Sequence, residues 1–210
     1  MRERICGLIH LKKLVYLISP NKIDQNFFAS LDRVLSLKNV KFFQLRLKNL
    51  SQKKILNFSK RIIKITTKHK VKFIINDNFI LASKIKVDGC HMGQLDGSFK
   101  IARKKLKGKI LGITCHNSKI LANNAIENKA DYIAFGSFFK SKLKSKAKKA
   151  NIYILRWAKK NTKKPIVAIG GINNLNYKKL IKAGAKYIAI SSYIWDNPKL
   201  KPEEAIKKFK

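Results

Sequence analysis

Acidic side chains are scarce in this chain of 210 residues, so their positions bear on its chemistry. Lysine and arginine number 48 against 11 aspartates and glutamates, a formal net charge of +37. Three acids lie within residues 73–97, FIINDNFILASKIKVDGCHMGQLDG. Asp77 and Asp96 follow short apolar runs, where neighbouring parallel strands would bring both carboxylates to one rim. Such a pair suits Mg²⁺, a hard cation usually held by one or two carboxylates plus substrate phosphates, whereas Asp88, before Gly89, is predicted to be structural.

Basic and polar side chains alternate with leucines in QLRLK, residues 44–48. Because side chains alternate along a strand, Gln44, Arg46 and Lys48 are expected to point to one side and the two leucines, Leu45 and Leu47, to the other. Arginine binds phosphate through two parallel hydrogen bonds and lysine supplies a point charge. The segment is therefore predicted to bind a phosphate, and the alternative is a solvated strand end.

Further hydrogen-bond donors follow other apolar runs. Gly170 and Gly171 allow backbone N–H groups to approach an anion, with a helix predicted to start near Asn173 or Asn174. Cys115 and His116 are adjacent in an extended chain and would point apart, so we do not expect a nucleophile there. The remaining candidates are hydroxyl and ammonium donors at strand ends and in the loop GSFFKSKLK: Thr114, Ser141, Lys142, Lys144, Ser191 and Ser192.

Eight short runs rich in branched and aromatic residues must position these groups, and segments with helical spacing separate them. Strict alternation of strand and helix predicts a parallel sheet, and eight units favour a single-domain (β/α)8 TIM barrel over residues 1–210, with an open flavodoxin-type sheet as the alternative. Asn26 and Ser51 are predicted N-caps, and Gly184 a helix end. The predicted strands are residues 15–19, 42–46, 72–76, 87–92, 110–114, 132–136, 165–170 and 187–191.

Cysteine usage, hydropathy and charge limit the expected location of the protein and the partners that it could bind. Cys6, Cys90 and Cys115 are odd in number and form no CxxC pair, so a reducing cytoplasm fits and a disulfide framework does not. No run approaches the roughly 20 apolar residues of a membrane span. The charge favours small phosphorylated substrates, nucleic acids and anionic membranes. Since lysines appear on most predicted helices, specific nucleic-acid binding is not expected, and a homo-oligomer stays compatible with the sequence.

An ordered set of segments covers nearly the whole chain and resembles the thiamine-phosphate synthases: QLRLK, IINDN, VDGCHMGQLD, GITCHN, DYIAFGSFFKSKLK, VAIGGI and YIAISS. The resemblance implies a (β/α)8 enzyme that joins 4-amino-5-hydroxymethyl-2-methylpyrimidine diphosphate to a thiazole phosphate and releases diphosphate. It implies a dissociative substitution in which the pyrimidine cation is captured by the thiazole nitrogen.

The resemblance also implies roles for individual residues. Asp77 and Asp96 match the family's magnesium acids, and Arg46, Lys48 and Lys144 would stabilise charge on the departing diphosphate. The pyrimidine diphosphate would be bound by Gln44, Leu45, Arg46, Leu47, Lys48, Asn76, Thr114 and Lys144. The thiazole phosphate would be bound by Ser141, Lys142, Leu143, Gly171, Ser191 and Ser192.

Three positions depart from the family pattern. Leu143 replaces the second threonine of a TxTK loop, which bears on thiazole binding; Lys140 replaces a frequent proline, and Thr114 stands where serine is usual. The alternative within the same fold is a thiazole tautomerase, for which His116 would suit proton transfer. Because a tautomerase does not need to bind diphosphate and magnesium, the acids Asp77 and Asp96 favour the synthase. A basic nucleic-acid-binding barrel is the more distant alternative.

Overall fold

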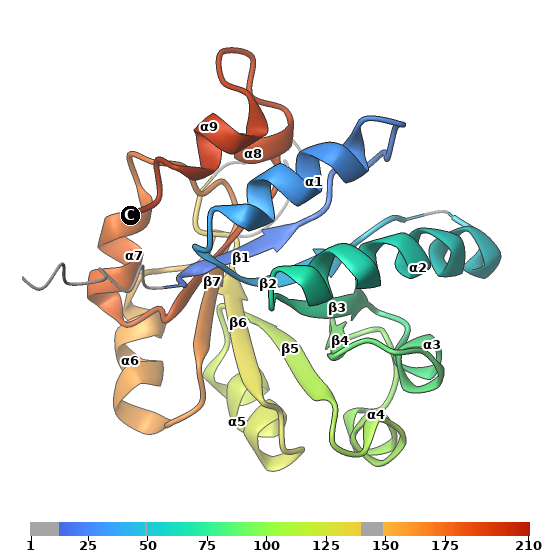
Figure 1. Cartoon of the computed structure of the whole chain (residues 1–210). Coiled ribbons are helices and arrows are strands. Elements are labelled where there is room, and N and C mark those ends of the chain that lie inside the picture. Colours follow the sequence, from blue (N-terminus) through green and yellow to red (C-terminus); the bar gives the residue numbers. More distant parts are fainter. Residues whose placement is uncertain (1–12, 49, 140–148) are drawn as a thin grey trace, which may run out of the picture.

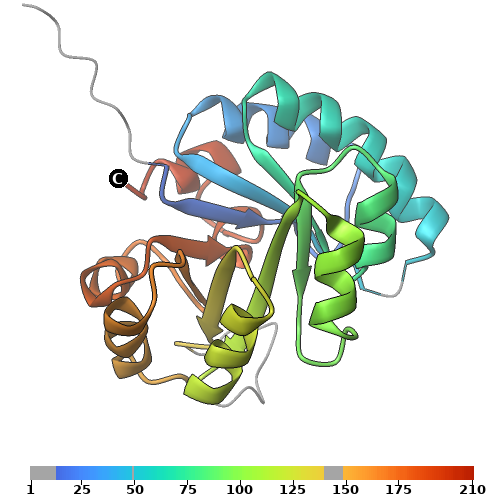
Figure 2. The same ribbon diagram turned by 90° about the horizontal axis from the view of Figure 1, so that it is seen from below.

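Eight parallel strands close into a barrel with helices around its outside (Figures 1 and 2). The structure is a computed structural model and describes residues 13–48, 50–139 and 149–210. Each strand pairs with the next, and β8 pairs with β1. This arrangement confirms the (β/α)8 prediction and rules out the open sheet. The strands are β1 Val15–Ile18, β2 Val40–Leu45, β3 Lys72–Asn76, β4 Gly89–Met92, β5 Ile110–His116, β6 Tyr132–Gly136, β7 Ile166–Ile169 and β8 Tyr187–Ile190.

The helices follow the strands in the predicted alternation. The predicted short segment after β3 is a helix of six residues. None of the helices in the described part of the chain is both long and apolar enough to cross a membrane. Whether residues 1–12 join the same domain stays a prediction. The helices are α1 Phe27–Ser36, α2 Gln52–Lys68, α3 Phe79–Lys84, α4 Phe99–Leu106, α5 Lys119–Glu127, α6 Tyr153–Asn161, α7 Tyr177–Ala183, α8 Ser192–Trp195 and α9 Pro202–Ile206.

Buried side chains form two separate layers because alternate residues of each strand face opposite ways. An outer layer packs between the strands and the helices, and an inner layer fills the barrel. On β6, for example, Tyr132 and Ala134 belong to the inner layer, whereas Ile133 and Phe135 belong to the outer one. The barrel is thus a packed core whose inward rows end at the carboxyl rim.

The residues at the helix ends match the caps predicted from the sequence in part. Ser51 caps α2, since its hydroxyl accepts from the Lys54 N–H, and Gly184 ends α7 with a φ of 122°. Asn26 makes no side-chain cap for α1. Asn26 does occupy the N-cap position of α1, as predicted, but the Asp24 carboxylate, rather than the Asn26 side chain, accepts from the N–H groups of Asn26 and Phe27.

The start of α7 also differs from the prediction. This helix begins at Tyr177 instead of near Asn173 or Asn174. Asn173 and Asn176 hold each other in a turn: the Asn173 N–H donates to the Asn176 side chain and the Asn176 N–H donates to the Asn173 side chain. A turn therefore separates the glycine pair from the helix.

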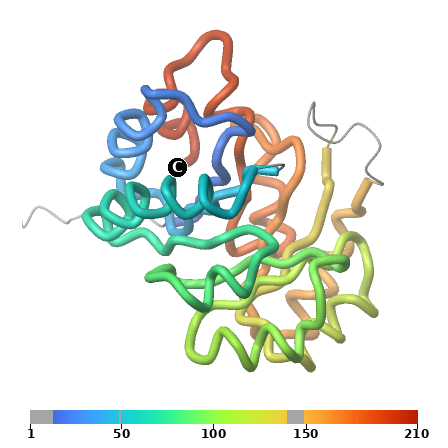
Figure 3. Tube along the Cα trace, turned by 90° about the vertical axis from the view of Figure 1, so that its right-hand side faces the viewer, coloured from blue at the N-terminus to red at the C-terminus, as the bar shows by residue number. Residues whose placement is uncertain are grey.

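The C-terminal segment closes the molecule against its N-terminal part. Helix α9 packs on α1 and α8, so the red and blue ends lie side by side in Figures 1 and 3. The Asn39 amide, at the start of β2, donates to the backbone carbonyls of Ile206 and Phe209. These bonds fix the amino end of the barrel, opposite the rim that carries the predicted site.

Candidate active site

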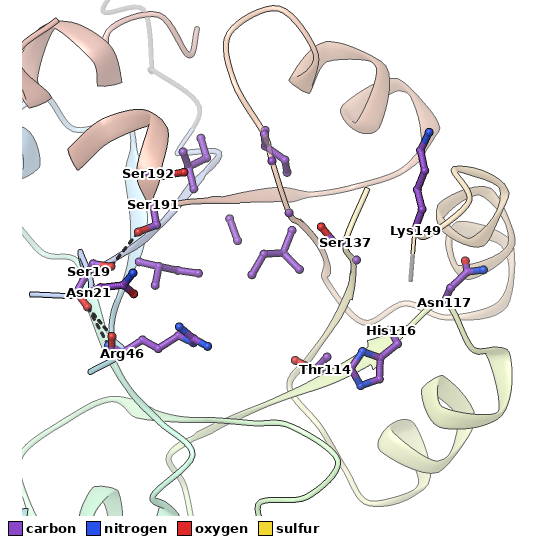
Figure 4. A pocket seen from close by; sticks show the side chains of 18 of the residues that line it. Ser19, Asn21, Arg46, Thr114, His116, Asn117, Ser137, Lys149, Ser191 and Ser192 are labelled. Carbon is purple, nitrogen blue, oxygen red and sulfur yellow. Dashed lines mark hydrogen bonds between the residues drawn. The ribbon is translucent and has the colours of Figure 1, made fainter. Parts of the chain in front are cut away.

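A cavity of about 690 Å³ opens at the carboxyl ends of the strands (Figure 4). Its polar wall comes from β1, β2, β5, β6, β7, β8 and the segments that follow them. Residues predicted from the sequence that line it are Arg46, Thr114, Gly171, Ser191 and Ser192. Side chains far apart in the chain thus face one space. The sequence interpretation did not single out several other lining residues: Ser19, Asn21, Asn117, Ser118, Ser137 and Lys149.

One wall of the cavity is a backbone cradle after β7 and β8. Gly170 and Gly171 have φ of 105° and 60°, which favour glycine. A Cβ on Gly170 would lie 2.0 Å from the Ser137 hydroxyl oxygen. After β8, the Ser191 hydroxyl donates to the Ser19 carbonyl at 2.9 Å, which fixes the start of α8 (Figure 4). The wall admits a ligand closely because its surface is main chain with small side chains.

Arg46 extends into the cavity from the end of β2 (Figure 4). The Ser19 hydroxyl oxygen accepts from the Arg46 backbone N–H at 3.0 Å, so β1 holds the residue in place. Inward of Arg46, Gln44 is 2% exposed and donates from its amide to the Asn76 side-chain oxygen at 2.9 Å. Gln44, which is buried, and Asn76, which is partly exposed, thus form one polar pair that joins β2 to β3.

The two leucines of QLRLK point away from Gln44 and Arg46. Leu45 and Leu47 belong to the outer core layer, as alternation predicts. Lys48, however, lines a smaller cavity of about 290 Å³ together with these leucines, Asn76 and Asp77. The predicted alternation therefore does not extend to Lys48, which lies three residues beyond the end of β2 at Leu45.

The two predicted metal acids lie close enough to interact. Burial, a hydrogen bond with Asp96 and the Asp96 charge raise the pKa of Asp77 to about 6, while Arg46 and Lys48 oppose the rise. Asp96 is held by the Gly93 N–H, which donates to its carboxylate at 2.6 Å. In the described part of the chain no three His, Cys, Asp or Glu side chains gather. Two crowded carboxylates fit a hard divalent cation that takes its other ligands from water and phosphate.

His91 lies directly behind the cavity residue Thr114, and the sequence interpretation did not single it out. It points inward from β4, with its Nε2 2.8 Å from the Thr114 hydroxyl and its Nδ1 2.9 Å from the Tyr132 hydroxyl. The signal lay in the sequence: His91 stands between Cys90 and Met92, two buried residues of the outer layer, so alternation places it inside.

Cys115 and His116 do not form a reactive pair. The Cys115 thiol is buried against the Leu121 carbonyl, and burial raises its pKa to about 12. His116 lines the cavity. The predicted loop residues Ser141, Lys142, Leu143 and Lys144 lie outside the described residues. Asp88, predicted to be structural, accepts from the Lys72 ammonium and from the Phe73 N–H.

The closed barrel and the polar residues at its carboxyl rim define a (β/α)8-barrel protein with a polar-lined cavity at that rim, the end of the barrel where such proteins bind their ligands. A family model described as thiamine monophosphate synthase matches residues 15–194. The chain belongs to the thiamine monophosphate synthase family, which confirms the resemblance seen in the sequence.

Named relatives agree with this membership. A thiamine-phosphate synthase of Pelagibacter ubique (strain HTCC1062) is 55% identical over 95% of this chain and 97% of its own length. Another, of Erythrobacter litoralis (strain HTCC2594), is 40% identical over 86% of this chain and 87% of its own. The solved structure of a thiamine phosphate pyrophosphorylase from Pyrococcus furiosus superposes with a TM-score of 0.83 at 25% identity, covering 95% of each chain.

Proposed function

We propose that this protein is a thiamine-phosphate synthase. It joins 4-amino-5-hydroxymethyl-2-methylpyrimidine diphosphate to 4-methyl-5-(2-phosphoethyl)thiazole, or to the carboxylated form of that thiazole, and gives thiamine phosphate and diphosphate. The observation that carries the proposal is the 55% identity, over 95% of this chain, to a protein named for this activity. The substrates are small phosphorylated molecules, which suits a chain of net charge +37.

In this proposal, the two substrates occupy different parts of the cavity. The thiazole phosphate lies against the cradle of Gly171, Ser191 and Ser192, where backbone groups can approach an anion. The pyrimidine diphosphate lies toward Arg46, Asn76 and Thr114. Support for this division comes from the groups that line the cavity: small residues and main chain after β7 and β8, and Arg46 after β2 with Thr114 on β5.

Asp77 and Asp96 would hold Mg²⁺, because their crowded negative charge needs a cation and they present only hard oxygen ligands. When bound, the ion supplies positive charge to the diphosphate oxygens. Arg46 and Lys48 act on the same region, since both influence the Asp77 carboxylate. Lys144 completes the set in our proposal, on the strength of the sequence resemblance alone.

The chain's own contribution to the reaction is electrostatic and positional. The bond between the pyrimidine methylene carbon and the diphosphate oxygen breaks, and its electron pair leaves with the diphosphate. The thiazole nitrogen lone pair then forms the new carbon–nitrogen bond. Arg46, Lys48 and Lys144 stabilise the charge that grows on the leaving group, and the cradle holds the thiazole in line. No protein nucleophile is needed.

The second candidate is a thiazole tautomerase of the same fold. The observation that favours it is His116, a residue able to transfer protons, in the cavity wall. The acid pair and the basic groups beside it have no use in that reaction, so we prefer the synthase. The cytoplasmic location stays a prediction from cysteine usage.

One assay tests the proposal. Purified protein is incubated with Mg²⁺, the pyrimidine diphosphate and either form of the thiazole phosphate, and thiamine phosphate is measured by chromatography. We expect product with at least one thiazole, and none when either substrate or the metal is left out. No product with either thiazole would reject the synthase, and tautomer exchange of the thiazole would then be measured on the same preparation.

A further inference from the structure

A chain of hydrogen bonds runs from the cavity wall into the barrel. The Thr114 hydroxyl lies 2.8 Å from His91 Nε2, and His91 Nδ1 lies 2.9 Å from the Tyr132 hydroxyl. The Tyr132 hydroxyl in turn lies 2.7 Å from the Tyr16 hydroxyl. Thr114 lines the cavity, whereas Tyr16 and Tyr132 are 2% and 1% exposed. The chain therefore connects a ligand-facing hydroxyl with two phenols that water does not reach.

The direction of these bonds follows from counting protons. Among the described residues, the Tyr16 hydroxyl has one hydrogen-bond partner, the Tyr132 oxygen. A buried O–H without an acceptor costs free energy, so Tyr16 donates to Tyr132. The Tyr132 proton must then go to its other partner, His91 Nδ1.

His91 receives its tautomer from that bond. Because Nδ1 accepts the Tyr132 proton, the ring carries its own proton on Nε2. The Nε2–H group then donates to the Thr114 oxygen. The opposite direction, from Thr114 inward, and a doubly protonated ring would each leave the Tyr16 proton buried without an acceptor.

We propose that His91 is a positioning residue: its Nε2–H fixes the Thr114 oxygen as an acceptor and so leaves the Thr114 hydroxyl proton to donate into the cavity. The ligand atom that receives this bond is an acceptor of the pyrimidine diphosphate, a ring nitrogen or a phosphate oxygen. The identity of the ligand rests on the proposed function, whereas the direction of the bonds does not.

The surroundings of the chain keep it in place. Burial raises the pKa of both Tyr16 and Tyr132 well above the ordinary value, so both phenols remain donors. The His91 and Tyr132 rings stack with an angle of 12° between their planes. Gly112, the cross-strand neighbour of both residues, has no side chain to occupy the space that the Tyr132 ring needs.

The bond direction can be read without activity. The full chain has four histidines, and long-range ¹H–¹⁵N correlation of the ¹⁵N-labelled protein reports which nitrogen of each ring is protonated. The His91 signals are assigned by their loss in His91→Gln. We expect a proton on Nε2 and none on Nδ1, and in Tyr132→Phe, which loses the donor to Nδ1, a shift away from this tautomer. A parent protein with its His91 proton on Nδ1, or with a charged ring, would overturn the proposal.

Enzyme kinetics test whether the hydrogen bonds from Tyr16 through Tyr132 and His91 affect the reaction through Thr114. Tyr132→Phe is expected to lower kcat/KM for the coupling roughly tenfold, since the donated bond at the ligand is lost or weakened. Tyr187→Phe is the matched control: Tyr187 lies in the same inner layer, and the described residues give its hydroxyl no hydrogen bond. It should stay within about twofold of the parent, as a change away from such networks does.

A double-mutant cycle closes the test. Thr114→Val removes the hydroxyl, so adding Tyr132→Phe to it should cost nothing further, whereas Thr114→Ser should keep the dependence on Tyr132. If the losses of kcat/KM in the two single variants added up in the double variant, Tyr132 would not act through Thr114. If the parent forms no thiamine phosphate, the proposed function fails, and the tautomer measurement still decides the direction of the bonds.

Discussion

At the scale of single residues, position matters more than the amount of charge. Asp77 and Asp96 meet at the rim even though burial and the charge of Asp96 raise the pKa of Asp77. Asp88, in the same stretch of sequence, is paired with Lys72 at 2.7 Å and accepts a backbone N–H from Phe73. Of three acids close in sequence, one thus has a structural role, and the other two are the pair that we propose binds the metal.

Asp96→Asn tests the metal assignment. One of two hard anionic ligands becomes neutral, so the Mg²⁺ concentration for half-maximal coupling should rise by roughly tenfold or more and the maximal rate should fall. The measurement is a magnesium titration of the coupling rate. Asp88→Asn is the matched control and should lower stability but leave the magnesium titration where it is. An unchanged titration in Asp96→Asn would reject the assignment.

Lys144→Ala tests whether one lysine matters in so basic a chain. If Lys144 contacts the departing diphosphate, its loss removes a bond that strengthens as the carbon–oxygen bond breaks, and such contacts are typically worth about 10² to 10³ in rate. Lys148→Ala, in the same loop, should stay near the parent. Steady-state coupling at fixed salt compares them, and equal effects would show that general charge, rather than Lys144, attracts the substrate.

At the scale of elements, β5 shows how a strand makes room for a neighbouring side chain. Gly112 faces the barrel interior between His91 on β4 and Tyr132 on β6. A Cβ there would lie 1.9 Å from Tyr132 Cζ. The missing side chain of Gly112 is therefore what allows the Tyr132 ring to reach His91, and the polar chain to Thr114 depends on it.

Gly112→Ala should consequently destabilise the protein. The inner layer has no room for the added methyl group, and overpacking of this kind costs about 1–3 kcal/mol. Urea unfolding followed by circular dichroism measures the free energy of unfolding. Gly108→Ala is the control, because a Cβ at Gly108 meets nothing within 4 Å, and it should be neutral or slightly stabilising. Equal stability of the two variants would contradict the packing argument.

At the scale of the whole molecule, the net charge of +37 predicts contacts beyond the substrates. We expect the protein to bind RNA at low salt without regard to sequence. If six to ten phosphates are contacted, affinity should fall by about 10³ to 10⁵ between 50 and 200 mM salt. Fluorescence anisotropy with two unrelated labelled RNAs checks this. Tight binding of only one of them at 200 mM salt would instead support the nucleic-acid-binding alternative.

The sequence by itself determined the barrel and most of its rim. The alternation of polar residues and leucines in QLRLK and the eight alternating strand and helix units are local patterns, so they indicate which residues face inward and where strands end. The positions of Gln44, Arg46 and Thr114 followed from them. The helix starts followed from the sequence only in part. The Asp24 carboxylate, rather than the Asn26 side chain, accepts from the Phe27 N–H at the start of α1. A turn between Asn173 and Asn176 precedes α7, which therefore starts later than predicted.

Only the tertiary structure decided which inward residues meet. His91, Tyr132 and Tyr16 come from strands β4, β6 and β1, and their contacts depend on barrel closure and on the stagger between strands. Gly112 stands opposite Tyr132 for the same reason. The pKa of Asp77 likewise depends on burial and on Asp96. Spacing along a chain encodes the face of each residue, but distances of a few ångströms between side chains on different strands are set only when the barrel closes.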